Sequence, residues 1–363
     1  MADLAEIQSV ASLGSHLRDI HELTLAELEQ AVILAGERPY RARQVMHRLW
    51  SADPASFNEM REVPAGLREY LNQHFRISQL MPSHVALSSD GTRKLLLRLG
   101  DGAEIESVII PMDGRITLCL SSQAGCAMAC EFCATARMGL RRNLAAGEII
   151  GQISAARRLL GPDERLTNYV FMGMGEPLAN YPSLKAALTA MTAEWGLQIS
   201  PRRITVSTVG LVPVMERLLS DFQVNLAVSL HAASDALRDR LAPINRRYPL
   251  SRLLEACRSL PISRRSRITF EYVMLDGVND SSDDARRLLK LLAPLKSKVN
   301  LIFFNPFPGV PFQSSPRSRV EAFQAILHRG NLTATIRESR GQDIAAACGQ
   351  LYAEQGGQSA VSA

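Results

Sequence analysis

The sequence lacks several features, and each absence excludes a class of protein. No apolar run approaches the roughly 20 residues that a membrane-spanning helix needs. Residues 1–6 contain neither the basic stretch nor the apolar core of a secretory signal peptide. Cysteine is scarce, with 6 in 363 residues, which is not the density of a disulfide-stabilised secreted domain. We therefore expect a cytoplasmic protein that does not enter a membrane and whose cysteines serve metal binding or catalysis.

A large excess of charge of one sign is also missing. The net charge is +5, a modest surplus that suits a polyanionic partner without requiring one. Paired arginines such as Arg141-Arg142 and Arg202-Arg203 could meet phosphates, but taken singly each pair indicates an ordinary solvated surface patch. The hydrophobic content of 46% is typical of a globular protein with a sizeable core.

The first 80 residues predict a small helical domain. Thr24 followed by Glu27 matches the capping box that begins a helix. A second amphipathic stretch then places Arg41, Arg43 and Arg48 where they are available to solvent. This accessory domain, residues 1–80, is therefore expected to present a basic face.

The apolar pattern changes from helical to alternating between residues 84 and 111. Ser89-Asp90-Gly91 is a turn signal, and the glycines at 100 and 102 provide another. We expect a β-ribbon that links the accessory domain to a core domain at 112–350, with a flexible tail at 351–363.

Within the core, short β-rich segments alternate with helical ones. The expected strands are 116–122, 168–172, 203–208, 225–230, 268–274 and 300–304. The expected helices are 145–160, 183–194, 212–220, 251–260, 283–292 and 319–328. Such alternation predicts βαβ units with a parallel sheet. Six units give an α/β fold that is a partial (β/α)₆ barrel, short of the usual eight.

Polar residues follow the expected strands at the end where parallel barrels place their active sites. They are Gly175 and Glu176 after the second strand, Ser207 in the third, Ser229-Leu230-His231 at the fourth and Asn305 at the sixth. Taken singly, each is explained as well by capping or by a loop hydrogen bond. Their shared position predicts one common site.

Three cysteines, Cys126, Cys130 and Cys133, follow the first strand with the spacing C-x₃-C-x₂-C. Three thiolates on a short loop suit zinc or an iron–sulfur cluster. A closed zinc site needs a fourth ligand, and no further cysteine or histidine follows nearby. A four-iron cluster held by three cysteines leaves one iron open for another ligand. Zinc completed by a distant ligand, or thiols that bind nothing, are the alternatives.

The cysteine spacing resembles that of the radical S-adenosylmethionine (SAM) superfamily. In combination with Gly173-Met-Gly-Glu-Pro-Leu178, Pro243-Ile-Asn245 and Asn305-Pro-Phe-Pro-Gly309, the sequence resembles the RlmN family over nearly its whole length. These enzymes methylate carbon 2 of an adenosine in 23S rRNA and in certain tRNAs, where it lies in the anticodon loop. The resemblance implies a [4Fe–4S] cluster on the three cysteines and two molecules of SAM per turnover.

The resemblance also assigns residues to the cofactor pocket. Gly175 and Glu176 would contact the methionyl amine, an interaction that a carboxylate favours through a charge-assisted hydrogen bond. The remaining pocket residues would be Ser207, Ser229, Leu230, His231 and Asn305.

Two further thiols acquire roles only through the resemblance, since by themselves they indicate small buried residues. Cys348 matches the cysteine that is methylated first and then carries the methyl group as a radical. Cys119 matches the thiol that releases the product and leaves a disulfide. Glu106 matches the proposed proton acceptor, although its position alone fits an outward-facing strand carboxylate. Cys257 matches no motif and is expected in the core.

Adenine carbon 2 is electron-poor and has no acidic proton, so a polar methyl transfer is not available and a radical route is needed. The resemblance further implies a one-electron reductant such as flavodoxin or ferredoxin, RNA binding by residues 1–80, and a monomer. Two rivals remain open: a related resistance enzyme that methylates adenine carbon 8, and a non-enzymatic RNA-binding protein with structural zinc.

Overall fold

The computed structural model describes residues 17–112, 114–263 and 266–352. The chain divides into two compact units, Met1–Gln79 and Leu80–Ala363, which are described separately. No helix in the described part of either unit is long and apolar enough to span a membrane.

The first unit is helical, as the periodicity indicates. Its helices are α2 (Leu25–Leu34), α3 (Tyr40–Ala52) and α4 (Ala65–His74), with short strands β1 (Arg18–Asp19) and β2 (Phe75–Arg76) paired in parallel. The predicted capping box at Thr24 and Glu27 is present. The basic face is weaker than expected, because Arg41 and Arg48 are half-buried and lie 3.9 Å from Glu37 and 3.6 Å from Glu62, respectively.

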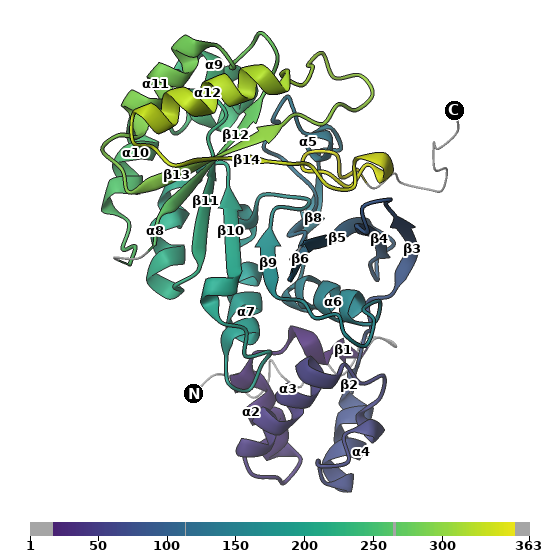
Figure 1. Ribbon diagram of the computed structural model, residues 1–363. Coiled ribbons are helices and arrows are strands. Elements are labelled where there is room, and N and C mark those ends of the chain that lie inside the picture. The colour runs from purple at the N-terminus through teal and green to yellow at the C-terminus, as the bar shows by residue number, and fades with distance from the viewer. Residues whose placement is uncertain (1–16, 113, 264–265, 353–363) are drawn as a thin grey trace. The chain divides into compact units, whose positions relative to one another are not determined.

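The second unit is built on one ten-stranded sheet (Figure 1). Seven of its strands are parallel: β6 (Arg115–Cys119), β9 (Asn168–Phe171), β10 (Ile204–Thr208), β11 (Asn225–Ser229), β12 (Ile268–Met274), β13 (Ser297–Phe303) and β14 (Ala334–Arg337). They follow one another in chain order across the sheet. The predicted α/β fold is confirmed, with one parallel strand more than the six expected.

The extra strand β14 contains only four residues at the edge of the sheet. Its run Ala-Thr-Ile-Arg is too short to be separated from a loop by sequence pattern alone.

Helices connect the parallel strands and lie on the outer side of the curved sheet (Figure 1). They are α6 (Ala146–Arg157), α7 (Tyr181–Thr192), α8 (Val212–Asp221), α9 (Asp235–Leu241), α10 (Leu250–Ser259), α11 (Ser282–Leu292) and α12 (Arg317–Arg329). All seven residues of β12 are buried, as expected for a strand covered on both faces. Cys257 lies in this core, buried on α10.

The segment expected as a separate β-ribbon belongs to the same sheet. Strands β3 (Pro82–Leu87), β4 (Arg93–Arg98) and β5 (Glu104–Met112) are antiparallel, and β5 pairs with β6. The segment is therefore not a linker. It extends the sheet and brings Glu106 next to the core.

Shorter elements complete the second unit. Strands β7 (Gln123–Gly125) and β8 (Leu140–Asn143) form a hairpin around α5 (Ala134–Arg137). Single 3₁₀ turns include Pro177–Asn180, Pro201–Arg203, Pro243–Arg246 and Gln342–Ile344 in this unit, and Ile20–Glu22 and Phe57–Glu59 in the first. Of the expected flexible tail, Leu351 is buried, contrary to the prediction; residues 353–363 lie outside the described part of the chain.

Candidate active site

The three cysteines of the C-x₃-C-x₂-C motif lie on the loop between β7 and β8. Gly125, which precedes the loop, has a φ of +79°, and a Cβ there would lie 1.9 Å from the carbonyl oxygen of Gly139. Only glycine permits this close crossing of the hairpin. The backbone N–H of Cys126 donates to the same carbonyl at 2.9 Å, so the crossing fixes where the cysteine loop begins.

Cys126, Cys130 and Cys133 line one cavity. Burial raises the pKa of the Cys126 thiol to about 12, and it also raises the pKa of Cys130 and Cys133, with repulsion between neighbouring thiolates adding to the effect at Cys126 and Cys130. Such thiols ionise only if a cation binds them. A metal centre is the natural cation for this donor set.

No three described His, Cys, Asp or Glu side chains are gathered closely enough to bind a single metal ion.

Tight backbone packing builds the next part of the cavity wall. Gly175 has a φ of +97°, and a Cβ there would lie 2.5 Å from the Cβ of Gln123. Glu176 is 4% exposed, and its carboxylate accepts hydrogen bonds from the backbone N–H groups of Leu178 at 3.0 Å and Val209 at 2.8 Å. Burial nevertheless raises its pKa to about 7. A cationic ligand would stabilise the negative charge of this buried carboxylate.

The ends of β10 and β11 contribute the neighbouring part of the wall. The hydroxyl oxygens of Ser207 and Ser229 are 3.5 Å apart, and both residues line the cavity. His231 also lines it, with a left-handed φ of 59°. Its Nδ1 accepts from the backbone N–H of Val273 at 3.0 Å, and burial lowers its pKa to about 3. The ring is therefore neutral, and Nε2 carries the proton.

Leu230 and Asn305 are not among the residues that line the cavity. Leu230 is fully buried. Asn305 supports the segment that carries Cys348 instead: its side-chain N–H₂ donates to the carbonyl of Cys348 at 3.2 Å, and its oxygen accepts from Gln342 at 2.8 Å.

Cys348 lies on the C-terminal segment, residues 345–352, and its side chain lines the same cavity as the cysteine loop. Other parts of the fold hold this segment. The backbone N–H of Ala134 donates to the carbonyl of Gly349 at 2.7 Å, and the Thr135 hydroxyl donates to the carbonyl of Leu351 at 2.7 Å. The helix that follows Cys133 therefore anchors the chain next to Cys348.

Glu106 is the other anchor of the C-terminal segment. It is 3% exposed, one carboxylate oxygen lies 2.8 Å from the Lys94 ammonium, and the other accepts from the backbone N–H of Tyr352 at 2.9 Å. Lys94 also donates to the carbonyl of Ala345 at 3.4 Å. Glu106 is thus inward-facing and paired, not an outward-facing strand carboxylate.

Cys119 ends β6 and is 6% exposed. It interacts electrostatically with Cys348, although it does not line the cavity itself. All six cysteines are free in this structure.

Two arginines that sequence reasoning missed complete the surroundings. Arg238 is fully buried and donates to the carbonyls of Leu230 at 3.1 Å and Val209 at 2.7 Å, and to the Asn245 side chain at 2.9 Å. It joins the ends of β10 and β11 and explains the Pro243-Ile-Asn245 motif. The second, Arg337, ends β14 and lines the cavity. Nothing in the sequence distinguishes either from a surface arginine.

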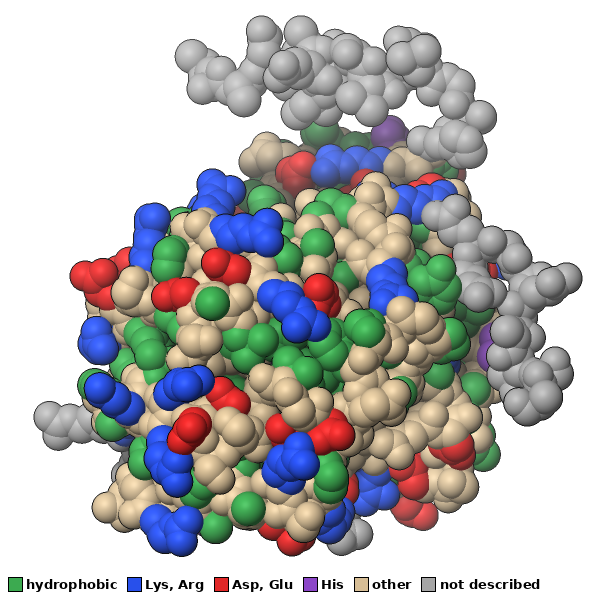
Figure 2. All heavy atoms as spheres, turned by 90° about the horizontal axis from the view of Figure 1, so that it is seen from above, with side chains coloured by type: hydrophobic (Ala, Val, Ile, Leu, Met, Phe, Trp, Pro, Cys, Tyr) green, Lys and Arg blue, Asp and Glu red, His purple; other side chains and the backbone are tan. Residues whose placement is uncertain are grey.

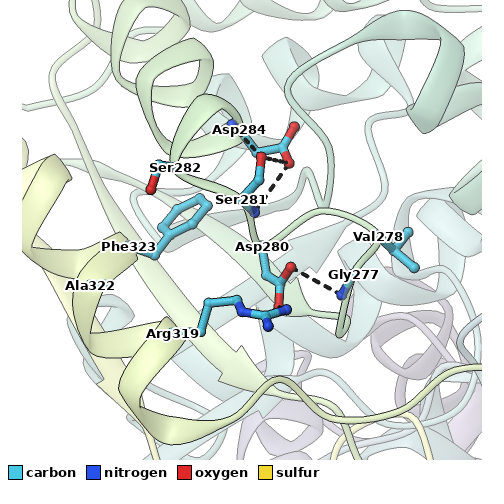
Figure 3. A pocket seen from close by; sticks show the side chains of 9 residues that line it. All are labelled: Gly277, Val278, Asp280, Ser281, Ser282, Asp284, Arg319, Ala322 and Phe323. Atoms are coloured by element: carbon cyan, nitrogen blue, oxygen red, sulfur yellow. Dashed lines mark hydrogen bonds and ion pairs between the residues drawn. The ribbon is translucent and has the colours of Figure 1, made fainter.

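A second cavity lies between α11 and α12 (Figure 3). Its polar groups bind one another: Asp280 accepts from Arg319 at 3.1 Å and from the Ser315 hydroxyl at 2.7 Å, while Ser281 and Asp284 form the capping box of α11. None of the predicted site residues lines it. The cysteine-lined cavity is therefore the candidate active site.

Comparison with known proteins agrees with this geometry. Residues 120–291 match the model of the radical SAM superfamily, and residues 18–77 match the N-terminal domain of a ribosomal RNA large subunit methyltransferase. A "Dual-specificity RNA methyltransferase RlmN" of Geobacter sulfurreducens is 51% identical over 333 residues, 92% of this chain and 91% of the relative.

The chain belongs to the RlmN family. A second RlmN, of Anaeromyxobacter dehalogenans, is 51% identical over 345 residues, 93% of this chain and 92% of its own. A radical SAM methyltransferase from Sphaerobacter thermophilus has a similar crystal structure, with a TM-score of 0.87 and 46% identity over 93% of this chain and all of that one. The expected radical SAM fold is confirmed. The protein is a radical SAM RNA methyltransferase, and its superfamily uses a [4Fe–4S] cluster and SAM.

Proposed function

We propose that this enzyme methylates carbon 2 of an adenosine in 23S rRNA and in a subset of tRNAs, using Cys348 as a methyl carrier. One observation carries the proposal: Cys348 lines the same cavity as the three-cysteine loop. A methyl group on this sulfur would lie within the cofactor chamber, where it can be both received and activated.

Cys126, Cys130 and Cys133 would hold the cluster, and the open iron would take the amino and carboxylate groups of SAM. When bound, the cluster and SAM supply the methyl group and the hydrogen-abstracting radical. Glu176 would accept a hydrogen bond from the methionyl amino group, helped by the close backbone approach at Gly175. Ser207, Ser229 and the Nε2–H of His231 offer hydrogen bonds to the rest of the cofactor, while Leu230 and Asn305 support the pocket from behind.

Cys348 and Cys119 occupy positions that suit different steps of the reaction. Cys348 is exposed on the cavity, which suits a group that meets both cofactor and base. Cys119 is buried and interacts electrostatically with it, which suits a thiol that acts after the base is attached. Glu106 would accept a proton from carbon 2, for which it must first release the Lys94 ammonium or the Tyr352 N–H.

RNA would be recognised partly by the first unit. Arg43 on α3 is exposed, and no described carboxylate lies within 4 Å of it. On the face of the second unit that Figure 2 shows, basic side chains are scattered among acidic ones and do not form one patch. Phosphate contacts on that face should therefore position the RNA without dominating its binding. A one-electron reductant such as flavodoxin or ferredoxin would act on a monomeric, cytoplasmic enzyme.

Mass spectrometry of nucleosides from RNA treated with the anaerobically purified enzyme tests the proposal. We expect 2-methyladenosine from both rRNA and tRNA. A product methylated at carbon 8 would assign the chain to the resistance-type activity. A colourless protein containing zinc and no iron would contradict the radical mechanism altogether.

A further inference from the structure

The guanidinium group of Arg337, at the end of a parallel strand, carries a positive charge that no carboxylate contact among the described residues neutralises. Arg337 is the last residue of β14, opposite Ile302 of β13, and its half-buried side chain lines the active-site cavity. Among the described residues no carboxylate oxygen lies within 4 Å of it. Its guanidinium group donates a weak hydrogen bond to the sulfur of Met172 at 3.8 Å.

Met172 connects this arginine to the resolving thiol. It follows β9, and its sulfur touches Arg337, while the next residue, Gly173, donates its backbone N–H to the carbonyl of Leu120, the residue after Cys119, at 3.1 Å. Cys119 on β6 is paired in register with Val170 on β9. Arg337 and Cys119 thus flank one residue of the cavity wall.

The charged groups that face Arg337 are few. Cys348, Glu271 and Cys119 act on it electrostatically, with Cys348 the strongest, and together they raise its pKa against the opposing effect of burial. Burial and the nearby Cys348 raise the pKa of Cys119 to about 12, and Arg337 is the cation that opposes both effects.

Glu271 is the obvious rival partner for Arg337. One of its oxygens accepts from the Asn300 side chain at 3.0 Å, and the other has no hydrogen-bond partner among the described residues. Burial raises the pKa of this carboxyl group, so its negative charge is itself disfavoured. An ordinary structural ion pair would bring the two groups into contact, which the structure does not do.

We propose that Arg337 is a positioning residue for product release, whose fixed positive charge stabilises the Cys119 thiolate as that thiol attacks the sulfur of Cys348. The proposal rests on the two-thiol reaction proposed above. An arginine suits the role because it stays protonated at any working pH.

The step balances without a further reactant. The Cys119 thiolate forms the sulfur–sulfur bond, and the bond between the Cys348 sulfur and the methylene carbon on the base breaks. The electron pair of that bond goes to the methylene carbon, which takes a proton and becomes the methyl group. Since the thiolate is the nucleophile, the rate follows the ionised fraction of Cys119.

The test measures decay of the covalent protein–RNA species. Enzyme carrying methylated Cys348 is given tRNA under single-turnover conditions, and the nuclease-sensitive slow band is followed on denaturing gels between about pH 7 and 9. For Arg337→Gln we expect the species to accumulate and to decay about tenfold more slowly near neutral pH, because a one-unit rise in thiol pKa lowers the thiolate fraction tenfold. The rate of Arg337→Gln should rise with pH in parallel with that of the unmodified enzyme, because the pKa of Cys119 lies above this range.

Matched variants separate charge from structure. Arg337→Lys should decay within a few-fold of the unmodified enzyme, since it keeps the charge. Arg317→Gln removes an exposed arginine that pairs with Glu338 and should change nothing. Glu271→Gln should not slow decay; a defect equal to that of Arg337→Gln would show that the two form a structural pair and would overturn the proposal.

Iron content and the mass of methylated Cys348, measured before RNA is added, establish that each variant is assembled. Should Arg337→Gln fail this check, Arg337→Met repeats the test with a side chain that is easier to bury.

Different results would contradict the proposed function and the proposed role of Arg337. If Cys119→Ala traps no protein–RNA species, the proposed function is wrong. If Cys119→Ala traps it while both neutral Arg337 variants resolve it at the unmodified rate and pH profile, only the role of Arg337 is wrong.

Discussion

The cysteine loop and the C-terminal segment bring thiols to the same cavity by different means. Cys126, Cys130 and Cys133 lie on a loop whose ends are closed by their own β7–β8 hairpin. Cys348 lies on a segment that follows the 3₁₀ turn Gln342–Ile344 and has no helix or strand of its own. Its position depends on bonds from Ala134, Thr135, Asn305 and Glu106.

The difference indicates a division of labour. A cluster needs fixed ligands, and the loop that carries them is closed by a local hairpin and held further by hydrogen bonds from Glu131 to Leu241 and from Arg137 to Gly309. A methyl carrier must meet the cofactor and later the base, and a segment held by a handful of separate hydrogen bonds can shift at modest cost, since each is worth about 1 kcal/mol. Substitutions in the cysteine loop should therefore have the largest effects, followed by those in the C-terminal segment and then by those outside both regions.

The largest effect is expected from Cys126→Ala, Cys130→Ala or Cys133→Ala. Each should abolish the iron–sulfur absorbance and all methylation, because each thiolate would hold one iron of the cluster and a substitute ligand would lack the right geometry. Ultraviolet–visible spectra and iron analysis of anaerobically purified protein measure this. Cys257→Ala, in the core of α10, is the control and should retain iron; full activity in any of the three loop variants would refute the ligand assignment.

Cys348→Ala and Cys119→Ala should both lose product, but at different stages. Without Cys348 no methyl group is carried, so neither product nor a protein–RNA complex forms. Without Cys119 the base is attached but not released, so a nuclease-sensitive slow band accumulates on denaturing gels. The same band in both variants, or in neither, would mean that at least one thiol is misassigned.

Glu106 distinguishes an anchoring role from a chemical one within the C-terminal segment. Glu106→Gln keeps an acceptor for the Tyr352 N–H but cannot take a proton, so we expect methylation to fall about 10²-fold, as for loss of a general base. Thr135→Val removes the hydroxyl that donates to the Leu351 carbonyl and leaves the Glu106–Lys94 pair intact, so it should cost about fivefold, the equivalent of one hydrogen bond. Single-turnover product formation measures both variants; equal losses would reduce Glu106 to an anchor.

The same contrast between local and long-range structure separates what the sequence could predict from what it could not. The cysteine spacing, the strand ends and most helices are local patterns, and they could be predicted directly. Cys348 has no local signal, and only its family resemblance indicated its role. β14 was missed because four residues on a sheet edge carry no period, and Arg238 and Arg337 because an arginine is normally exposed. Their burial follows from tertiary neighbours far away in sequence.

The smallest effect is expected outside both regions, on the basic face of α3. Because Arg41 and Arg48 lie near Glu37 and Glu62, we expect Arg43→Gln to account for most of the loss of RNA affinity, a few-fold at moderate salt. Each lost phosphate contact should flatten the slope of log affinity against log salt by about 1.

Binding of a tRNA measured at several salt concentrations checks this prediction. Glu62→Gln is the matched opposite change, because it frees Arg48 and should tighten binding slightly. Arg41 and Arg48 would be shown to act directly if their neutralisation weakened binding as much as that of Arg43. Unchanged binding and slope in all the arginine variants would instead mean that this face is only solvated, and that RNA affinity resides in the second unit.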